Sequence, residues 1–194
     1  CRRIASSMDT AKSLFISVAA GISHQLLQDN LGSAAVIIRS MPNTPAAIGY
    51  GMTGLYTNES TVVSYRHKAE SILSSVGKTL WLNDESALDA VTALSGSGPA
   101  YLFYFMECLQ KSGQALGLNN EQSTLLTLEM IHGAAKLALA SEASFAELRS
   151  NVTSKGGTTE AALNSLSSND LQRLITEALN AAAERSKEIS QSFQ

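Results

Sequence analysis

The chain has 194 residues, enough for one domain with a sizeable core or for two small ones. Its formal net charge is -3 and its basic residues form no run, so nothing favours a nucleic-acid or membrane partner. There is no apolar stretch of about 18 residues and no signal-peptide pattern, so we expect a cytoplasmic protein. Cys1, Cys108 and three scattered histidines indicate neither a disulfide framework nor a metal site.

The first 83 residues alternate between short apolar runs and helical patterns. Residues 13–19 predict a strand, residues 22–31 a helix and residues 34–39 a second strand. The second run is almost entirely apolar, which suits a parallel sheet covered on both faces. We then expect a strand, a helix and a last strand over residues 51–57, 61–76 and 79–82. This order is typical of the second half of an α/β unit.

Two prolines follow the second strand in the motif Met41-Pro-Asn-Thr-Pro45. Proline fixes φ and has no N–H, so the motif predicts an irregular loop. Ligands of open α/β sheets bind beyond the carboxyl ends of the strands, which makes this loop a candidate site. A rigid connecting turn explains the same pattern equally well.

From Asn83 onward, long helical patterns replace the β-branched runs, so we place a domain boundary there. The predicted domains are residues 1–83, the second half of an α/β unit, and residues 84–194, a helical domain. A short helix over residues 86–94 is interrupted by Ser95-Gly-Ser-Gly-Pro99, which we interpret as architecture that starts the next helix.

The helix over residues 101–116 has one apolar face and stops at Gly117. That face carries Leu102, Phe105, Met106, Leu109, Gly113 and Leu116. Capping boxes at Asn119 with Gln122 and at Ser144 with Glu147 predict two further helix starts. The closing helices are expected at residues 159–166 and 171–189. Such an array can bury its apolar faces internally or against a second copy.

A glycine pair lies between two of these helices, in Asn151-Val-Thr-Ser-Lys-Gly-Gly-Thr-Thr-Glu160. Glycine leaves its amides unshielded, and a helix start adds free N–H groups and the positive end of the helix dipole. The pattern therefore predicts a site for a carboxylate or phosphate. The alternative is a plain interhelical turn with a threonine N-cap.

Three motifs together resemble the pyrroline-5-carboxylate reductase family. They are Met41-Pro-Asn-Thr-Pro45, Val91-Thr-Ala-Leu-Ser-Gly-Ser-Gly-Pro-Ala-Tyr101 and Val152-Thr-Ser-Lys-Gly-Gly-Thr-Thr159. The resemblance covers the chain from about Ser13 onward. It implies a fold of class α/β plus all-α, in which a partial Rossmann-type parallel sheet is followed by a helical dimerisation domain. It also implies a homodimer, or a larger homo-oligomer, whose active sites combine both subunits.

The activity implied is reduction of 1-pyrroline-5-carboxylate to L-proline by hydride from NADPH or NADH. The resemblance assigns substrate contacts to Glu85, Asn151, Ser154, Gly156, Gly157, Thr158 and Thr159. It assigns cofactor contacts to Val18, Ala19, Ala20, Asn43, Thr44 and Asn151. Thr159 and Glu85 are the candidate catalytic residues: a hydroxyl can hydrogen-bond the ring nitrogen, and a carboxylate can stabilise its developing charge. Glu85 also fits the role of an acidic residue at a helix start.

Two features depart from the family pattern. Lys155 stands where the family commonly has proline, and we expect the loop to keep its function because its glycines and threonines remain. The Gly-x-Gly-x-x-Gly turn that cradles a dinucleotide pyrophosphate is also missing, so these residues alone should bind NAD(P)H poorly. We expect the chain to lack the N-terminal half of the Rossmann domain.

Two other functions fit parts of the pattern. One is a non-catalytic dimerisation and carboxylate-binding fragment without the cofactor half, which would bind proline without turnover. The other is a β-hydroxyacid dehydrogenase, which needs a lysine on a catalytic helix. Neither Lys111 nor Lys136 has the surrounding pattern that such a lysine requires.

Overall fold

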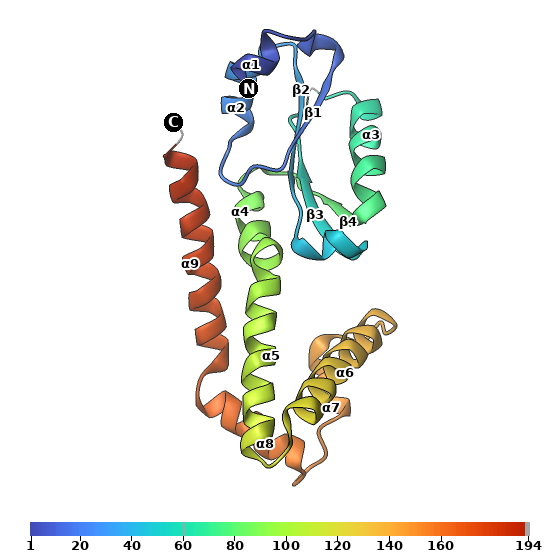
Figure 1. Cartoon of the computed structure of the whole chain (residues 1–194), viewed down its shortest axis with the longest axis vertical. Coiled ribbons are helices and arrows are strands. Elements are labelled where there is room, and N and C mark those ends of the chain that lie inside the picture. The colour runs from blue at the N-terminus through green and yellow to red at the C-terminus, as the bar shows by residue number, and fades with distance from the viewer. Residues whose placement is uncertain (60, 193–194) are drawn as a thin grey trace. The chain divides into compact units, whose positions relative to one another are not determined.

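The computed structural model describes residues 1–59 and 61–192, which fold as two compact units (Figure 1). Unit 1 comprises Cys1–Pro99 together with Ala178–Gln194, and unit 2 comprises Ala100–Glu177. Residues 84–99 and the end of the chain group with unit 1, and the predicted boundary at residue 83 stays a prediction. Among the described residues, no helix is long and apolar enough to cross a membrane.

Unit 1 is built on one four-stranded sheet, and its strands lie in chain order. The strands are β1 (Leu14–Ser17), β2 (Val36–Met41), β3 (Gly51–Tyr56) and β4 (Gly77–Trp81). The pairs β1–β2 and β3–β4 are parallel, whereas β2 and β3 are antiparallel. The predicted fold class is confirmed, but the sheet is mixed where we expected it to be parallel. The connection from β2 to β3 is too short for the crossover that parallel neighbours need.

Helices cover both faces of this sheet (Figure 1). Helix α2 (His24–Leu31) packs on one face and α3 (Val63–Leu73) on the other. Neighbouring residues of β2 point to opposite faces of the sheet. Ile37 packs with Leu27 and Leu31 of α2, Ile38 packs with Ala69 of α3, and both isoleucines are at most 1% exposed. This alternation explains why the strand is apolar at successive positions.

The connection after β2 is more regular than the prolines suggested. Thr44–Ile48 form a 3₁₀ helix, η2, with Pro45 near its start, so the prediction of an irregular loop is wrong for these residues. A proline is tolerated in the first turn of a helix, where its missing N–H has no intrahelical acceptor in any case. Only Pro42 and Asn43 remain extended.

The segment at Ser95-Gly-Ser-Gly-Pro99 is not a plain break either. Helix α4 (Ala87–Val91) continues as the π-helical turn η4 (Thr92–Gly96), and α5 (Gly98–Ala115) begins two residues later. The N–H of Ser97 donates to the carbonyl of Thr92 at 2.8 Å, which closes the wide turn. Such π turns often occur at functional positions.

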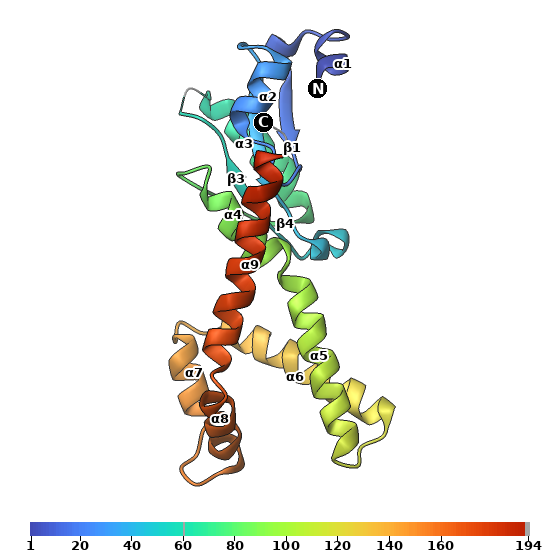
Figure 2. The ribbon, with the colours of Figure 1, turned by 90° about the vertical axis from the view of Figure 1, so that its left-hand side faces the viewer.

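Unit 2 consists of helices (Figure 2). After α5 come α6 (Asn120–Leu139), α7 (Phe145–Asn151), α8 (Thr158–Ser168) and the first part of α9 (Leu171–Gln191). The structure confirms both predicted capping boxes, at Asn119 with Gln122 and at Ser144 with Glu147. Short elements complete the chain: α1 (Arg2–Ala5), η1 (Thr10–Lys12) and η3 (Ser74–Val76).

The last part of α9 belongs to unit 1. The hydroxyl of Ser186 donates to a carboxylate oxygen of Asp89 on α4 at 2.6 Å. Gly21, with φ +75°, lies so close to the end of α9 that an added Cβ would be 2.7 Å from Cγ2 of Ile189. Any larger side chain at Gly21 would therefore displace the β1–α2 connection from α9.

Candidate functional site

The parallel pair β1–β2 creates one open carboxyl edge in unit 1. Ser17 and Arg39 are register partners, so the residues that follow both strands leave the sheet side by side. The hydroxyl of Ser40 donates to the carbonyl of Ser17 at 3.0 Å and holds the two strand ends together. The predicted cofactor residues meet at this edge: Val18, Ala19, Ala20, Asn43 and Thr44. Their contact with a cofactor stays a prediction.

Asn43 organises the edge through both atoms of its side-chain amide. Its Oδ1 accepts the N–H of Met52 at 2.9 Å, and its Nδ2 donates to the hydroxyl of Ser95 at 3.2 Å. An amide has two donor hydrogens and two acceptor lone pairs, so Asn43 keeps one of each for a ligand. Ser95, which we interpreted from sequence as architecture, thus borders the same edge.

Glu85 is fixed by two partners that are distant in sequence. Its Oε1 accepts a hydrogen bond from Nη1 of Arg39 at 2.7 Å and from the backbone N–H of His24 at 2.5 Å. Its neighbour Asp84 accepts the N–H of Ser86, the N-cap of α4, at 2.8 Å, and none of the side chains that the structure describes caps the first turn of that helix. The sequence offered Glu85 as a helix-start acid, and the structure shows that it binds the first N–H of a different helix, α2, whose N-cap is Ser23.

The surroundings of this pair are largely buried. The Arg39 side chain is 9% exposed and that of Glu85 29%. The ring of His24 is buried and meets Tyr56 edge-on, with centroids 6.3 Å apart; its Nε2 has no partner among the described residues. Burial, and then the negative charge of Glu85, raise the pKa of the Tyr56 hydroxyl, so this tyrosine is neutral at physiological pH.

The second group of predicted site residues lies in unit 2, between α7 and α8. Asn151 ends α7, Gly156 has φ +72°, and Gly157 is the N-cap of α8. The threonine N-cap considered from sequence is therefore wrong: Thr158 and Thr159 are the first two helical residues. Their N–H groups lie in the turn that has no intrahelical acceptor. Together with Ser154, these residues form one loop.

This loop is open to solvent and internally braced. The N–H of Gly157 donates to the carbonyl of Ser154 at 3.0 Å, and the N–H of Gly156 donates to Oε2 of Glu160 at 2.7 Å. Lys155 and both threonines are exposed. Sequence reasoning missed Glu160, although a carboxylate four residues after a glycine and in the first turn of a helix is a recognisable signal.

Comparison with known proteins decides the family. A family model described as pyrroline-5-carboxylate reductase dimerisation matches residues 85–189. A Pseudomonas aeruginosa pyrroline-5-carboxylate reductase is 45% identical over 191 residues, which are 98% of this chain and 70% of that protein. One from Pasteurella multocida is 41% identical over 189 residues, or 97% and 69%. The chain belongs to the pyrroline-5-carboxylate reductase family.

Solved structures of such reductases have the same fold. The enzyme from Coxiella burnetii superposes with a TM-score of 0.92 at 44% identity, covering 98% of this chain and 70% of the other. A Plasmodium falciparum enzyme with NADP bound superposes with a TM-score of 0.84 at 32% identity, covering 93% and 72%. The chain thus spans about 70% of the length of the reductases it matches.

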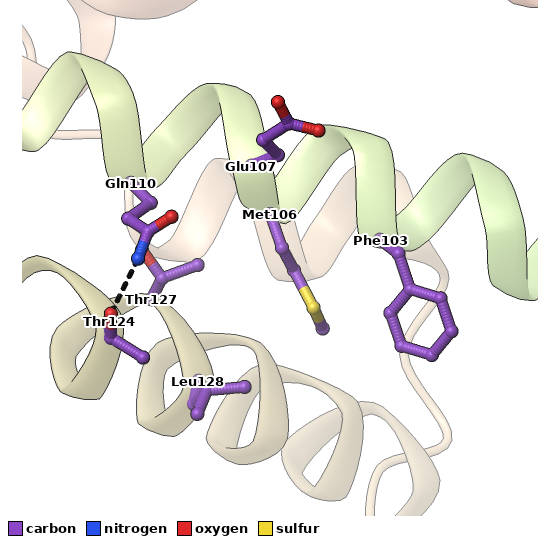
Figure 3. A pocket seen from close by; sticks show the side chains of 7 residues that line it. All are labelled: Phe103, Met106, Glu107, Gln110, Thr124, Thr127 and Leu128. Atoms are coloured by element: carbon purple, nitrogen blue, oxygen red, sulfur yellow. Dashed lines mark hydrogen bonds between the residues drawn. The ribbon is translucent and has the colours of Figure 1, made fainter.

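In this family member the helices of unit 2 expose an apolar groove (Figure 3). A cavity of 220 Å³ lies between α5 and α6, and Nε2 of Gln110 donates to the hydroxyl of Thr124 at 2.6 Å beside it. Phe103, Met106 and Leu128 line its apolar part. Among the described residues, no cluster of His, Cys, Asp or Glu could hold a metal ion.

The predicted apolar face of α5 remains open in the single chain. No residue of α5 is buried, and Leu102, Phe105 and Leu116 are 43%, 46% and 88% exposed. In residues 100–177, all of which the structure describes, only Ser123 and Thr127 are buried. These apolar helices lie in the region that the dimerisation model matches, which explains why they carry so much exposed apolar surface.

Proposed function

We propose that the two groups of residues divide the binding work of this reductase. Its function is the reduction of 1-pyrroline-5-carboxylate to L-proline with hydride from NAD(P)H, the final step of proline biosynthesis. The carboxyl edge of β1 and β2 binds the cofactor, and the loop before α8 binds the carboxylate of the substrate. The observation that carries this proposal is the open loop at Gly156 and Gly157, which presents first-turn N–H groups to solvent.

The edge of unit 1 suits the nicotinamide end of a cofactor. Val18 is 60% exposed just after β1, and small side chains follow it at Ala19 and Ala20, so a flat ring can approach the backbone. Asn43 offers its spare amide donor and acceptor, and Thr44 an exposed hydroxyl. We propose NADP as the cofactor, with NAD as the alternative, supported by the related structure with NADP bound. When bound, it supplies the hydride.

The loop of unit 2 orients the substrate through its carboxylate. The N–H groups of Thr158 and Thr159 and the side chain of Ser154 are donors that suit an anion, whereas the N–H groups of Gly156 and Gly157 brace the loop through Glu160 and Ser154. Asn151, at the end of α7, is proposed to contact both substrate and cofactor. Fixing the carboxylate fixes the ring, so that hydride reaches one carbon and one face.

Thr159 is the proposed catalytic residue of the loop. Its hydroxyl can donate to the ring nitrogen, or accept from it, while the imine becomes an amine. Glu85 stays a prediction as a second catalytic or substrate-binding residue. Its carboxylate is already bound to Arg39 and to the N–H of His24, and these contacts favour a different role, argued below.

We also propose that the protein acts as a homodimer in the cytoplasm. The matched dimerisation region supports a homo-oligomer, and the exposed apolar face of α5 and α6 provides the surface for the second copy. The alternative of a non-catalytic dimerisation fragment loses support because the similarity to the reductases extends over 98% of the chain, cofactor edge included.

The test is a product assay on the protein purified from its native source, so that its natural polypeptide is the one assayed. With 1-pyrroline-5-carboxylate and NADPH, we expect proline to appear in a one-to-one ratio with oxidised cofactor. Omitting the imine is the control, because cofactor oxidation should then stop. Proline binding without turnover would contradict the proposal and favour the non-catalytic fragment.

A further inference from the structure

The ion pair of Arg39 and Glu85 joins the two segments that carry the cofactor edge. Arg39 lies on β2, two residues before its end, and that strand leads into Asn43 and Thr44. His24, whose N–H binds the same Glu85 oxygen, is the first residue of α2 and closes the connection that begins with Val18. The carboxylate of Glu85 therefore binds both β2, through Arg39, and the start of α2, through His24.

Within the connection from β1 to α2, the N–H of Ala19 donates to the hydroxyl of Ser17 at 3.4 Å, and Ser23 is the N-cap of α2. Val18, Ala19 and Ala20 are exposed, and they are followed by the buried Gly21 and His24. Gly21 is held by close packing against Ile189. The N–H of His24 is the point at which a charged group fixes the start of α2, and charge-assisted hydrogen bonds are shorter and stronger than neutral ones.

The contacts of Glu85 favour a structural role in holding β2 and α2 together. Its Oε1 accepts from both Arg39 and His24, and the Arg39 side chain is 9% exposed. Removing Arg39 would leave the partly buried carboxylate without its counter-charge, and a buried unpaired charge is strongly disfavoured. At the start of its own helix, α4, no side chain of the described residues caps the first turn, so Glu85 does not act there as a capping acid.

We propose that Arg39 and Glu85 are positioning residues for the cofactor, acting as a clamp that holds the β1–α2 connection against β2. The clamp rests on the proposed function only in naming NAD(P)H as the ligand of this edge. It keeps Val18, Ala19 and Ala20 beside Asn43, so that the nicotinamide end meets a preformed surface. Glu85 then acts through the backbone of α2 and does not touch the substrate.

A double-mutant cycle tests the clamp. Glu85→Gln keeps an oxygen that can accept from His24 but removes the charge, Arg39→Met removes the guanidinium, and the double variant removes both charges. Arg66→Met is the matched control, because Arg66 stacks 4.4 Å from the ring centroid of Trp81, outside the clamp. The readouts are NADPH affinity from its fluorescence, steady-state kinetics, and amide exchange over residues 18–26.

We expect each single variant to weaken NADPH binding roughly tenfold, since displacement of a supporting segment is felt at the site it supports. The double variant should bind no more weakly than the worse single variant, because both act on one contact. Amide exchange at the start of α2 should quicken in the three clamp variants and stay unchanged in Arg66→Met.

Two results would overturn the clamp. One is an additive cycle, in which the double variant loses the product of the two single losses. The other is unchanged NADPH affinity in Glu85→Gln with a fall in kcat alone, which would make Glu85 a catalytic residue. If Arg39→Met fails to fold, as judged by circular dichroism, the NADPH affinity and the amide exchange of Glu85→Gln alone decide, because the cycle then lacks one corner.

Failure of the clamp and failure of the proposed function give different results. If the wild-type protein makes no proline, the function fails, while NADPH affinity and amide exchange still report on the clamp. If proline forms normally but the cycle is additive, the function stands and only the clamp fails.

Discussion

The two units of this reductase bury their side chains in opposite ways. Unit 1 surrounds a sheet whose central residues Ile37, Ile38 and Leu55 are at most 1% exposed. Unit 2 has helices of similar apolar content, yet it leaves Phe103 63% and Leu126 58% exposed. Unit 1 is stabilised by its own core. Unit 2 has exposed apolar faces that we propose are covered by another copy of the chain. The stability of unit 2 should therefore depend on protein concentration and that of unit 1 should not.

The largest effect is expected from a charge on the open face of unit 2. Phe103→Asp places a carboxylate in the groove between α5 and α6, where the proposed dimer would have to bury it. We expect the dimer dissociation constant to rise more than about 100-fold, because buried aromatic anchors dominate interfaces. Light scattering on the eluting protein measures the mass directly.

The control for this change lies in unit 1. Val63 is 62% exposed on α3, so Val63→Asp adds the same charge to an equally exposed position outside the proposed interface. It should leave the dimer intact. A Phe103→Asp protein that stays dimeric would place the interface elsewhere.

The core of unit 1 should respond to a cavity without any dependence on concentration. Ile38→Ala removes a side chain that is 0% exposed and should cost about 2–5 kcal/mol of unfolding free energy. Ile72→Ala, on a residue 57% exposed, should cost less than about 0.5 kcal/mol. Urea unfolding at two protein concentrations checks both values. Equal losses in the two variants would mean that the sheet is not the core of this unit.

The glycine loop tests backbone conformation at the carboxylate site. Gly156 has φ +72° and space for a methyl group, so Gly156→Ala meets strain of about 1–2 kcal/mol without a clash. Gly117, with φ +100° and equal space, is a matched control in a turn far along the chain from the loop. We expect Gly156→Ala to raise the KM for the imine and the same change at Gly117 to leave it unchanged. Equal KM values in the two variants would mean that the loop does not bind the substrate.

The smallest effect concerns the second capping box. Hydrogen bonds from the Ser144 side chain and then from its backbone hold the pKa of the Glu147 carboxyl below its ordinary 4.5. A depressed folded-state pKa stabilises above the unfolded value and is lost as pH falls through the folded value. The stability difference between wild type and Glu147→Gln should therefore be present at neutral pH and shrink as pH falls below the ordinary carboxyl pKa of 4.5. Urea unfolding from neutral to acid pH measures it. If the stability difference persisted at acid pH, the charge of Glu147 would not be its cause.

Local chemistry was readable from the sequence, and contacts between distant segments were not. Both capping boxes follow from residues three positions apart, and the structure confirms them. The stop at Gly117 and the apolar run of β2 are likewise local signals. The antiparallel direction of β3 depends on how a short connection folds back, which periodicity does not encode.

The candidate site shows the same division. The glycine loop was recognisable because its donors are consecutive, from Ser154 to Thr159. The partners of Glu85 were not recognisable, because Arg39 and His24 are 46 and 61 residues away. One signal was available: Arg39 is the only charged residue of β2, a strand expected to be buried, and a buried charge requires a partner.

The central claim is that the two units bind different ligands of one reaction. The most direct measurement is the pair of KM values, for imine and for NADPH, in Thr159→Ala and in Asn43→Ala. We predict that Thr159→Ala raises the KM for the imine and leaves that for NADPH unchanged, and that Asn43→Ala does the reverse. Unchanged kinetics in Thr159→Ala, or parallel changes of both KM values in both variants, would contradict the account.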